Sequence, residues 1–257
     1  MELGLKDKVA IITGATQGIG HATALMLAAE GARVVICARK QAGLDSTAAT
    51  IRAAGGAVHT VSADVSKGPD CARIVSEAIG AFGGIDILVN NAGTSATGEF
   101  EQATDEIWQA DFDLKLFAAI RLVREAVPHM RKRGGGRIVN VTNIGAKQPG
   151  ARTMPTTVTR AAGLAMTKAL SKEYAPQGIL VNAICIGLIR AGQHETKAAR
   201  RGVDLEEMYQ EMGRNVPIGR VGRAEEAANV ISFLVSEAAS FVTGSSINLD
   251  GGASAVF

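Results

Sequence analysis

The sequence has few aromatic residues and no long hydrophobic run. One tryptophan, two tyrosines and seven phenylalanines stand against 30 glycines in 257 residues. This composition disfavours a β-sandwich, whose strands use many aromatic and β-branched side chains, and favours tight turns between strands and helices. No apolar segment approaches the ~18 residues of a membrane helix, so we expect no membrane partner.

The chain also lacks an excess of charge of one sign. Its 27 Lys and Arg residues nearly balance 25 Asp and Glu residues, which gives a formal net charge of +2. No basic stripe is present that could hold nucleic acid through its phosphates, and the basic segment at 131–137 is interpreted as a solvated helix end and loop. We therefore expect no nucleic-acid partner.

Cysteine is scarce, and no CxxC motif occurs. Cys37, Cys71 and Cys185 form an odd, widely spaced set, which favours small buried side chains in a reducing compartment over disulfides. The first predicted strand begins near Lys8, which leaves no room for a signal peptide. These features predict a cytoplasmic protein. No His, Cys and carboxylate cluster has the spacing of a metal site, so we expect no metal.

What is present is a regular alternation of short Val- and Ile-rich runs with longer Ala-rich segments. Strands are predicted at 8–13, 33–37, 57–63, 86–90, 137–142, 180–185 and 245–250, and helices at roughly 18–30, 41–54, 67–82, 104–132, 154–176 and 224–236. This is the pattern of βαβ units, so we expect an α/β fold with a doubly wound parallel sheet, a Rossmann fold of three layers. No linker or repeat interrupts the pattern, which favours a single domain over residues 1–257.

The segment between the sixth predicted strand and the last predicted helix is aperiodic. Long excursions at the carboxyl edge of such a sheet commonly cover a substrate, so residues 190–222 are predicted to form a substrate lid. A partly ordered connector is the alternative.

A glycine-rich loop lies between the first predicted strand and the first predicted helix. It reads IITGATQGIGHATAL, with Gly14, Gly18 and Gly20 at the turn. Glycine allows the backbone to approach a pyrophosphate, and the following helix presents its N–H groups and positive dipole end. The loop therefore predicts a dinucleotide site.

The end of the second predicted strand bears on which dinucleotide is bound. NAD-binding folds commonly carry an acidic residue there, whereas this chain has Ala38 followed by Arg39 and Lys40. A missing acid with an adjacent guanidinium favours the 2′-phosphate of NADP over NAD. The alternative is that Arg39 is an ordinary surface charge.

Five segments together carry a resemblance to a known family. They read TGATQGIG at 13–20, ADV at 63–65, NNAG at 90–93, GRIVNVT at 136–142 and GRAEEAANVISFLVSEAASFVTGSSINLDGG at 222–252. They follow the expected order over nearly the whole chain. On these motifs the chain is identified as a member of the short-chain dehydrogenase/reductase family.

The resemblance implies a set of cofactor-binding residues. The glycine-rich loop would contribute Gln17 and Ile19 beside its three glycines, and other parts of the cofactor would meet Asp64 and Val65 (adenine), Asn91, Ala92 and Gly93 (ribose), and Gly187 and Ile189 (nicotinamide). Relatives usually have Pro before the glycine that corresponds to Gly187, where this chain has Ile186.

The resemblance also implies that the catalytic centre is atypical. Relatives use an Asn, a Ser and a Tyr-x-x-x-Lys pair to move the proton while a hydride is transferred. Alignment of the motifs gives Lys115, Asn143, Thr156 and Arg160 at these four positions. The two tyrosines of this chain do not restore a Tyr-x-x-x-Lys pattern.

The replacements suggest different roles for the four positions. Thr156 and Arg160 are four residues apart and share a helix face. On this face Arg160 could bind the cofactor through its ribose hydroxyls, and Thr156 could orient a substrate. Asn143 could donate a hydrogen bond to a carbonyl oxygen.

Lys115 is the replacement that could titrate usefully. Beside Arg160 its pKa would fall, which would make it a general acid or base. The alternative is that Lys115 only fills its helix face or pairs with Asp111 or Asp113.

We therefore expect an NADP(H)-binding oxidoreductase that acts on a small carbonyl or alcohol substrate through an atypical active site. The alternatives are a cofactor-binding sensor, partner or scaffold without redox turnover, and a non-redox enzyme with Lys115 as a reactive amine. A homodimer or homotetramer is also expected, formed through the apolar stripes at 116–123 and 164–170, although these stripes could equally face the core.

Overall fold

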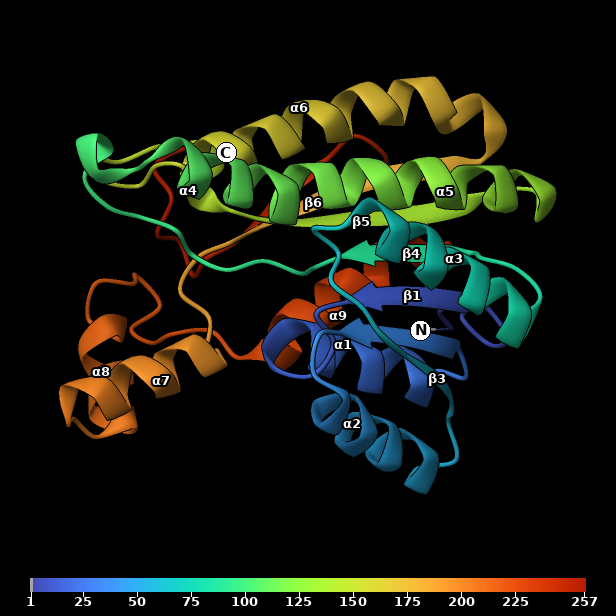
Figure 1. Cartoon of the computed structure of the whole chain (residues 1–257), viewed down its shortest axis with the longest axis horizontal. Coiled ribbons are helices and arrows are strands. Elements are labelled where there is room, and N and C mark those ends of the chain that lie inside the picture. The colour runs from blue at the N-terminus through green and yellow to red at the C-terminus, as the bar shows by residue number, and fades with distance from the viewer. Residues whose placement is uncertain (1) are drawn as a thin grey trace.

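The computed structural model describes residues 2–257, apart from the side chains at positions 193 and 195–197. It contains a seven-stranded parallel sheet in the order β3-β2-β1-β4-β5-β6-β7 (Figure 1). The strands are β1 (Val9–Thr13), β2 (Arg33–Ala38), β3 (Ala57–Ser62), β4 (Ile87–Asn90), β5 (Gly136–Asn143), β6 (Ile179–Ile186) and β7 (Ser246–Leu249).

Helices cover both faces of this sheet. They are α1 (Gly18–Ala29), α2 (Gln41–Ala53), α3 (Gly68–Phe82), α4 (Asp105–Phe112), α5 (Ala118–Lys132), α6 (Thr156–Tyr174), α7 (Gly192–Arg201), α8 (Leu205–Gly213) and α9 (Ala224–Leu234). In Figure 1, α3, α5 and α6 lie on one side and α1, α2 and α9 on the other. The predicted α/β fold, a doubly wound parallel sheet in three layers, is confirmed.

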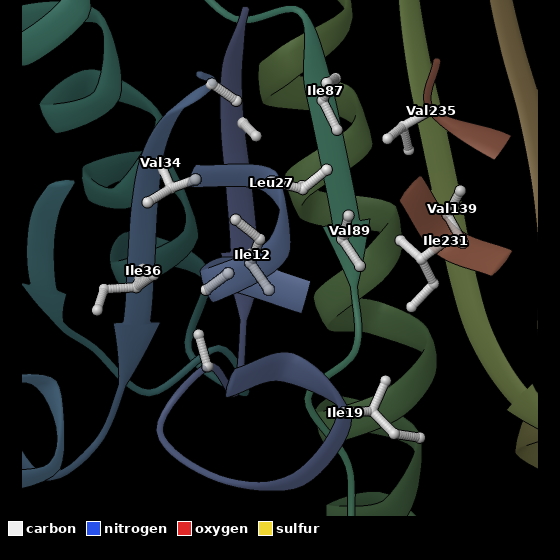
Figure 2. Packing of buried hydrophobic residues seen from close by; sticks show 14 of the residues in the cluster. Ile12, Ile19, Leu27, Val34, Ile36, Ile87, Val89, Val139, Ile231 and Val235 are labelled. Carbon is white, nitrogen blue, oxygen red and sulfur yellow. The ribbon is translucent and has the colours of Figure 1, made fainter. Parts of the chain in front are cut away.

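The strands form where Val and Ile are concentrated because both faces of a parallel sheet are buried. All five residues of β1 are buried. Figure 2 shows one core layer, in which Ile12 of β1 lies close to Leu27 of α1, and Ile231 of α9 lies beside Val139 of β5. A second buried cluster on the other face includes Ile74 of α3 and side chains of α5. All three cysteines are buried free thiols, and Cys37 and Cys71 belong to this second cluster.

The strand order reverses between β1 and β4. The chain moves outward from β1 to β2 and β3, then returns to add β4 to the other edge of β1. The loops that follow β1 and β4 therefore diverge to opposite faces and leave a crevice at the carboxyl edge, the usual ligand position in such folds.

One long predicted helix is interrupted. The segment predicted as one helix over 104–132 consists of α4, the π-helical segment η2 (Asp113–Phe117) and α5. A π-helical turn accommodates one extra residue without leaving helical backbone angles, so hydrophobic periodicity gives little sign of it. Lys115 lies inside η2 and is buried.

Smaller differences occur at other boundaries. Helix α6 begins at Thr156, two residues after the predicted start at 154, and Pro155 is its cap residue. The aperiodic segment contains α7 and α8. The short 3₁₀ turns are η1 (Phe100–Gln102), η3 (Ile144–Ala146), η4 (Ala175–Gln177) and η5 (Glu237–Ala239). Within residues 2–257, no helix is both long enough and apolar enough to cross a membrane.

Candidate active site

The glycine-rich loop turns directly from β1 into α1. Gly14 and Gly18 have positive φ angles of 66° and 55°, which residues with a side chain rarely adopt. Gly20 is required for a different reason, since a Cβ there would overlap the carbonyl of Gly14. Ile19 is buried in the core, and Gln17 is exposed as the cap residue of α1. Gly20 therefore lets the loop pack against itself, while a Cβ at Gly18 would meet no atom within 4 Å.

The loop after β4 is joined to the glycine-rich loop. The Asn91 side chain donates hydrogen bonds to the carbonyl oxygens of Thr13 (2.9 Å) and Gly14 (3.2 Å). The Thr13 hydroxyl accepts from the backbone N–H groups of Asn91 and Ala92, both at 2.9 Å. These bonds hold the two loops as one unit at the switch point of the sheet.

Arg160 reaches the same unit from α6. Its Nη1 donates to the carbonyl of Val141 at 2.6 Å, and a Cβ on Gly93 would overlap Nη2. The glycine therefore leaves the space that the guanidinium occupies. The Arg160 Nε is buried and has no hydrogen-bond partner within the described part of the chain. Burial lowers the pKa of Arg160 to about 10, which nearby Asp111 partly opposes.

Lys115 lies at the centre of a buried polar cluster. Its Nζ donates to an oxygen of Asp111 and to the Thr156 hydroxyl, the latter at 2.7 Å. Asp111 also accepts from the Thr159 hydroxyl at 2.7 Å. Burial, with the positive charge of Arg160, lowers the pKa of Lys115 to about 8 against the opposing effect of Asp111.

Both interpretations of Lys115 therefore describe part of the geometry. The lysine pairs with Asp111, and it is also close enough to Arg160 for the two charges to interact. Asp113, the other carboxylate considered as a partner, instead accepts from Arg121 at 3.0 Å.

Thr156 is fully engaged in hydrogen bonds. Its hydroxyl donates to the carbonyl of Ala96 and accepts from the N–H of Ala96, both at 2.9 Å, and it also accepts from Lys115. A hydroxyl has one proton and two lone pairs, so no position is left for a substrate. Thr156 thus connects α6 to the loop after β4, and orientation of a substrate by this hydroxyl is not supported.

Asn143 ends β5 at the carboxyl edge of the sheet. Its side-chain Oδ1 is buried and lacks a hydrogen-bond partner in residues 2–257. Asn143 pairs in register with Ile186, directly before Gly187, whose N–H donates to the Leu249 carbonyl at 2.9 Å. An unpartnered amide at this edge is positioned to meet a ligand, since buried polar atoms are otherwise paired.

The two ends of the segment at 190–222 are joined by backbone hydrogen bonds. Ile189 forms a β-bridge with Gly222, whose N–H donates to Leu188 while its carbonyl accepts from Arg190, both at 2.9 Å. A Cβ on Gly192, the first residue of α7, would lie 2.7 Å from the side-chain oxygen of Gln17. The segment therefore lies against the glycine-rich loop.

The remaining predicted cofactor residues follow β2 and β3. Arg39 is exposed directly after β2. Asp64 accepts from the N–H and hydroxyl of Ser66 at 3.1 and 2.8 Å, and Val65 is buried. These residues lie at the same carboxyl edge as the glycine-rich loop but at its outer end.

A small cavity of about 20 Å³ lies beside the buried cluster, between the sheet and helices α5 and α6. Lys115, Arg160, Asn90 and Asn140 contribute polar groups to its lining. Asn90 donates to Asn140 at 2.9 Å, and Asn140 donates to Thr167 at 2.9 Å. These amides are thus partly committed to each other.

Thr159 and Ala96 carry no sequence signal, because they join the cluster through contacts between distant segments. Asn140 lies in the family motif at 136–142, and Asp111 is one of the two partners that the sequence offers for Lys115. His21 is turned toward α2, where its Nδ1 lies 3.1 Å from the Thr47 hydroxyl. No group of three His, Cys, Asp or Glu residues could hold a metal ion in the part of the chain described.

Comparison with known proteins agrees with this arrangement. The family model described as enoyl-(acyl carrier protein) reductase matches residues 14–254. The chain is 38% identical over 249 residues to dehydrogenase/reductase SDR family member 4 of Homo sapiens, covering 96% of this chain and 88% of that protein. It is 33% identical over 247 residues to short-chain reductase protein NovJ of Streptomyces niveus, covering 96% and 94%.

Solved structures resemble the whole chain. L-sorbose reductase from Gluconobacter frateurii, complexed with NADPH and L-sorbose, has a TM-score of 0.95 and 37% identity, with 100% of both chains covered. An NADPH-bound short chain oxidoreductase from Pseudomonas aeruginosa PAO1, described as containing an atypical catalytic center, has a TM-score of 0.93 and 32% identity, covering 99% of this chain and 100% of that one. The fold, the crevice and the sequence identities together show that this chain belongs to the short-chain dehydrogenase/reductase family.

Proposed function

We propose that the protein is an NADP(H)-dependent oxidoreductase that interconverts a carbonyl and an alcohol through an atypical active site. One observation carries this proposal: two cations, the buried Lys115 and the partly buried Arg160, lie beside the joined loops at the switch point of the sheet. We take Lys115, Asn143, Thr156 and Arg160 as the equivalents of the family's four catalytic positions.

The residues at the crevice fit a dinucleotide. The open space beside Gly18 at the start of α1 and the unpartnered amide oxygen of Asn143 are features that such a ligand would use. The contacts would come from Gly14, Gln17, Gly18, Ile19 and Gly20 at the pyrophosphate, Asp64 and Val65 at the adenine, Asn91, Ala92, Gly93 and Arg160 at the ribose, and Gly187 and Ile189 at the nicotinamide. When bound, NADPH would supply a hydride to the carbonyl carbon of the substrate.

The chain's own contribution is electrostatic and geometric. Reduction places negative charge on the substrate oxygen, and the positive charges of the buried Lys115 and the partly buried Arg160 stabilise that charge. The unpartnered Oδ1 of Asn143 can accept a hydrogen bond from an N–H or O–H group of the substrate or the cofactor. Thr156 fixes the position of the loop that carries Ala96.

Cofactor preference is assigned to Arg39. An exposed guanidinium after β2 suits the 2′-phosphate of NADP, and similar structures were solved with NADPH. Titration by intrinsic fluorescence or calorimetry should show tighter binding of NADPH than of NADH. Arg39→Ala should reduce NADPH affinity about tenfold and leave NADH affinity unchanged. The matched control is Arg124→Ala, an exposed arginine on α5.

Turnover is the second test. Absorbance of the reduced nicotinamide should fall with at least one member of a panel of ketones, quinones and aldehydes, including L-sorbose because a similar enzyme was solved with it. Alcohols test the reverse direction. Failure to bind either dinucleotide would contradict the proposal, and binding without turnover would favour a sensor, partner or scaffold.

We further propose that residues 1–257 form a single domain and that 190–222 form the substrate lid. The β-bridge between Ile189 and Gly222 and the contact of Gly192 with Gln17 support a lid that lies over the crevice.

A further inference from the structure

Lys115 is a buried cation, and one N–H of its ammonium group has no acceptor among the described residues. Its side chain is 0% exposed, and its ammonium group carries three N–H donors. Asp111 and Thr156 each accept one of them, and no third acceptor occurs among the described residues. Lys115 and Arg160 both line the small cavity between the sheet and helices α5 and α6. One N–H of Lys115 is therefore available to a single polar atom that enters this cavity.

The other polar groups of the cluster are poorly suited to proton exchange. Thr156 has its proton committed to Ala96, and an alcohol is a very weak acid. Arg160 keeps its proton more firmly than Lys115, and the amide of Asn143 does not titrate. Lys115 is thus the one member whose proton can leave and return near neutral pH.

Asp111 is placed to hold this lysine rather than to replace it. Its two side-chain contacts, Lys115 and Thr159, are both donors, which suits a carboxylate. Asp111 on α4 and Arg160 on α6 are the charged groups that face Lys115, while the strands beside it contribute the neutral Asn90 and Asn140. Asp111 thus favours the protonated lysine, and Arg160 opposes it.

We propose that Lys115 exchanges the proton with the substrate oxygen and that Asp111 is its positioning residue. This rests on the proposed function of the site. In reduction the carbonyl carbon gains a hydride from the reduced nicotinamide, and the π-electron pair moves to oxygen. That oxygen then takes a proton from the Lys115 ammonium. Lys115 is left neutral and regains a proton from water, so that one hydride and one proton are added in each turnover.

A direct measurement on the protein tests the titration of Lys115. NMR of protein labelled at lysine Cε and Nζ should contain one lysine that loses its charge near pH 8, and the signal should be absent from Lys115→Arg. Asp111→Asn should move this titration to lower pH by about one unit, because an attractive charge is removed. A Lys115 signal that stays charged above pH ~10, an ordinary lysine pKa, would overturn the proposal whether or not a substrate is known.

Kinetics test the role in turnover. Lys115→Met and Lys115→Arg should each lower kcat for carbonyl reduction by roughly 10²- to 10⁴-fold, since neither side chain can supply a proton near neutral pH. Lys115→Arg keeps a positive charge beside Asp111. If Lys115 had a purely structural role, this variant would therefore retain activity. The double variant Lys115→Met/Asp111→Asn avoids a stranded carboxylate if the single variant is unstable. Lys168→Met, an exposed lysine of α6, should match the wild type.

The pH profile separates positioning from structure. Wild-type reduction should decline above pH ~8 as Lys115 loses its proton, while alcohol oxidation should increase over the same range. In Asp111→Asn both transitions should move to lower pH. A wild type that binds NADPH and reduces no carbonyl would defeat the proposed function and this inference together. Turnover that survives in Lys115→Arg would defeat the inference alone.

Discussion

At the residue scale, two glycines of the site are defined by the space around them. A Cβ at Gly20 would overlap the carbonyl of Gly14, and a Cβ at Gly93 would overlap the guanidinium of Arg160. Neither glycine has a positive φ angle, so the requirement is close approach and not backbone conformation. The family motif identifies these positions, but only the fold shows what each glycine accommodates.

Gly93 allows a specific test of how Arg160 is held. Gly93→Ala should displace the guanidinium from the loop after β4 and weaken NADPH binding by about ten- to a hundredfold, the range for loss of a charge-assisted hydrogen bond. Calorimetric titration with NADPH measures the effect. Gly98→Ala is the matched control, because a Cβ there meets no atom within 4 Å. If the two variants bind NADPH with equal affinity, the position of Arg160 does not contribute to NADPH binding.

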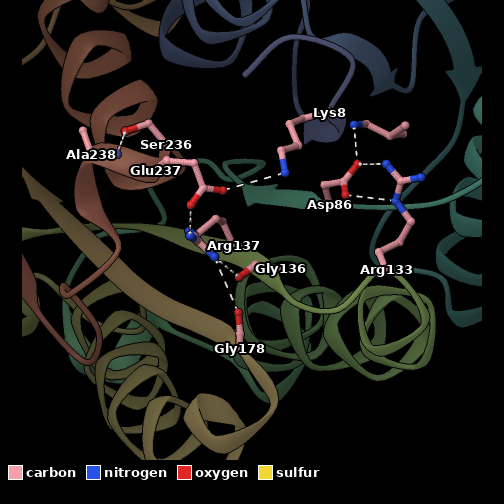
Figure 3. A network of polar contacts seen from close by, with 10 residues as sticks. Lys8, Asp86, Arg133, Gly136, Arg137, Gly178, Ser236, Glu237 and Ala238 are labelled. Atoms are coloured by element: carbon pink, nitrogen blue, oxygen red, sulfur yellow. Dashed lines mark hydrogen bonds and ion pairs between the residues drawn. The ribbon is translucent and has the colours of Figure 1, made fainter. Parts of the chain in front are cut away.

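At the element scale, Asp86 joins two elements at the amino edge of the sheet. Asp86 accepts from the N–H of Val9 at 2.8 Å and from Nε and Nη2 of Arg133 at 3.0 and 2.9 Å (Figure 3). It thereby joins β1 to the end of α5. Glu237, also drawn in Figure 3, forms more exposed ion pairs with Lys8 and Arg137.

The two carboxylates should differ in their effect on stability. Asp86→Ala leaves the buried Val9 N–H without an acceptor and should lower the free energy of unfolding by about 2–3 kcal/mol. Glu237 is 58% exposed, so Glu237→Ala should cost about 0–1 kcal/mol. Urea denaturation of both variants measures the difference. Equal losses would show that burial does not distinguish the two networks.

The proposed lid has its own small aromatic core. Tyr209 of α8 is 4% exposed, its hydroxyl accepts from Ala191, and its ring lies under Arg190 at 4.6 Å and against His194 at 5.6 Å. Arg190 also forms two bonds with Glu206 at 2.6 and 2.7 Å. These contacts hold α7 and α8 together independently of the sheet.

Loss of this core should loosen the lid locally. Tyr209→Ala removes the packed ring and should speed protease cleavage within 190–222 and raise the KM for the carbonyl substrate about fivefold or more, with little change in Tm. Limited proteolysis and steady-state kinetics check this. Val203→Ala, at an exposed position between α7 and α8, is the control. A large fall in Tm with unchanged KM would instead make this segment part of the structural core.

At the scale of the whole molecule, the structure shows whether the apolar stripe at 116–123 faces the core or an exposed surface. Ala118, Ala119, Leu122 and Val123 of the stripe at 116–123 are buried against the sheet. Phe117 of the same stripe is 38% exposed, and Phe241 before β7 and Phe257 at the end of the chain are fully accessible. The first stripe therefore serves mainly the core of one chain.

A homo-oligomer remains our expectation, since exposed large aromatic side chains are commonly covered in assemblies. Light scattering coupled to gel filtration should give a mass of two or four times the 26.6 kDa chain. Phe241→Asp should shift the mass downward if this residue lies in an interface. A single species at the mass of one chain would contradict the expectation.

The sequence by itself determined the fold class, the strand positions and the glycine-rich loop. These follow from local signals: Val and Ile concentrate where a strand is buried on both faces, and glycines lie where the backbone must turn or approach closely. The sequence also established that no Tyr-x-x-x-Lys pair exists, because a missing residue type needs no structure to be recognised.

Only the tertiary structure decided how the replacement residues are connected. Asp111 and Lys115 come from one helical region, Thr156 and Arg160 from α6, and Ala96 from the loop after β4, so their hydrogen bonds span up to 60 residues of sequence. The π-helical segment that contains Lys115 leaves no periodic signature. Burial of these charges, which sets the pKa of Lys115, is a property of packing between helices and sheet and therefore cannot be derived from residue identities alone.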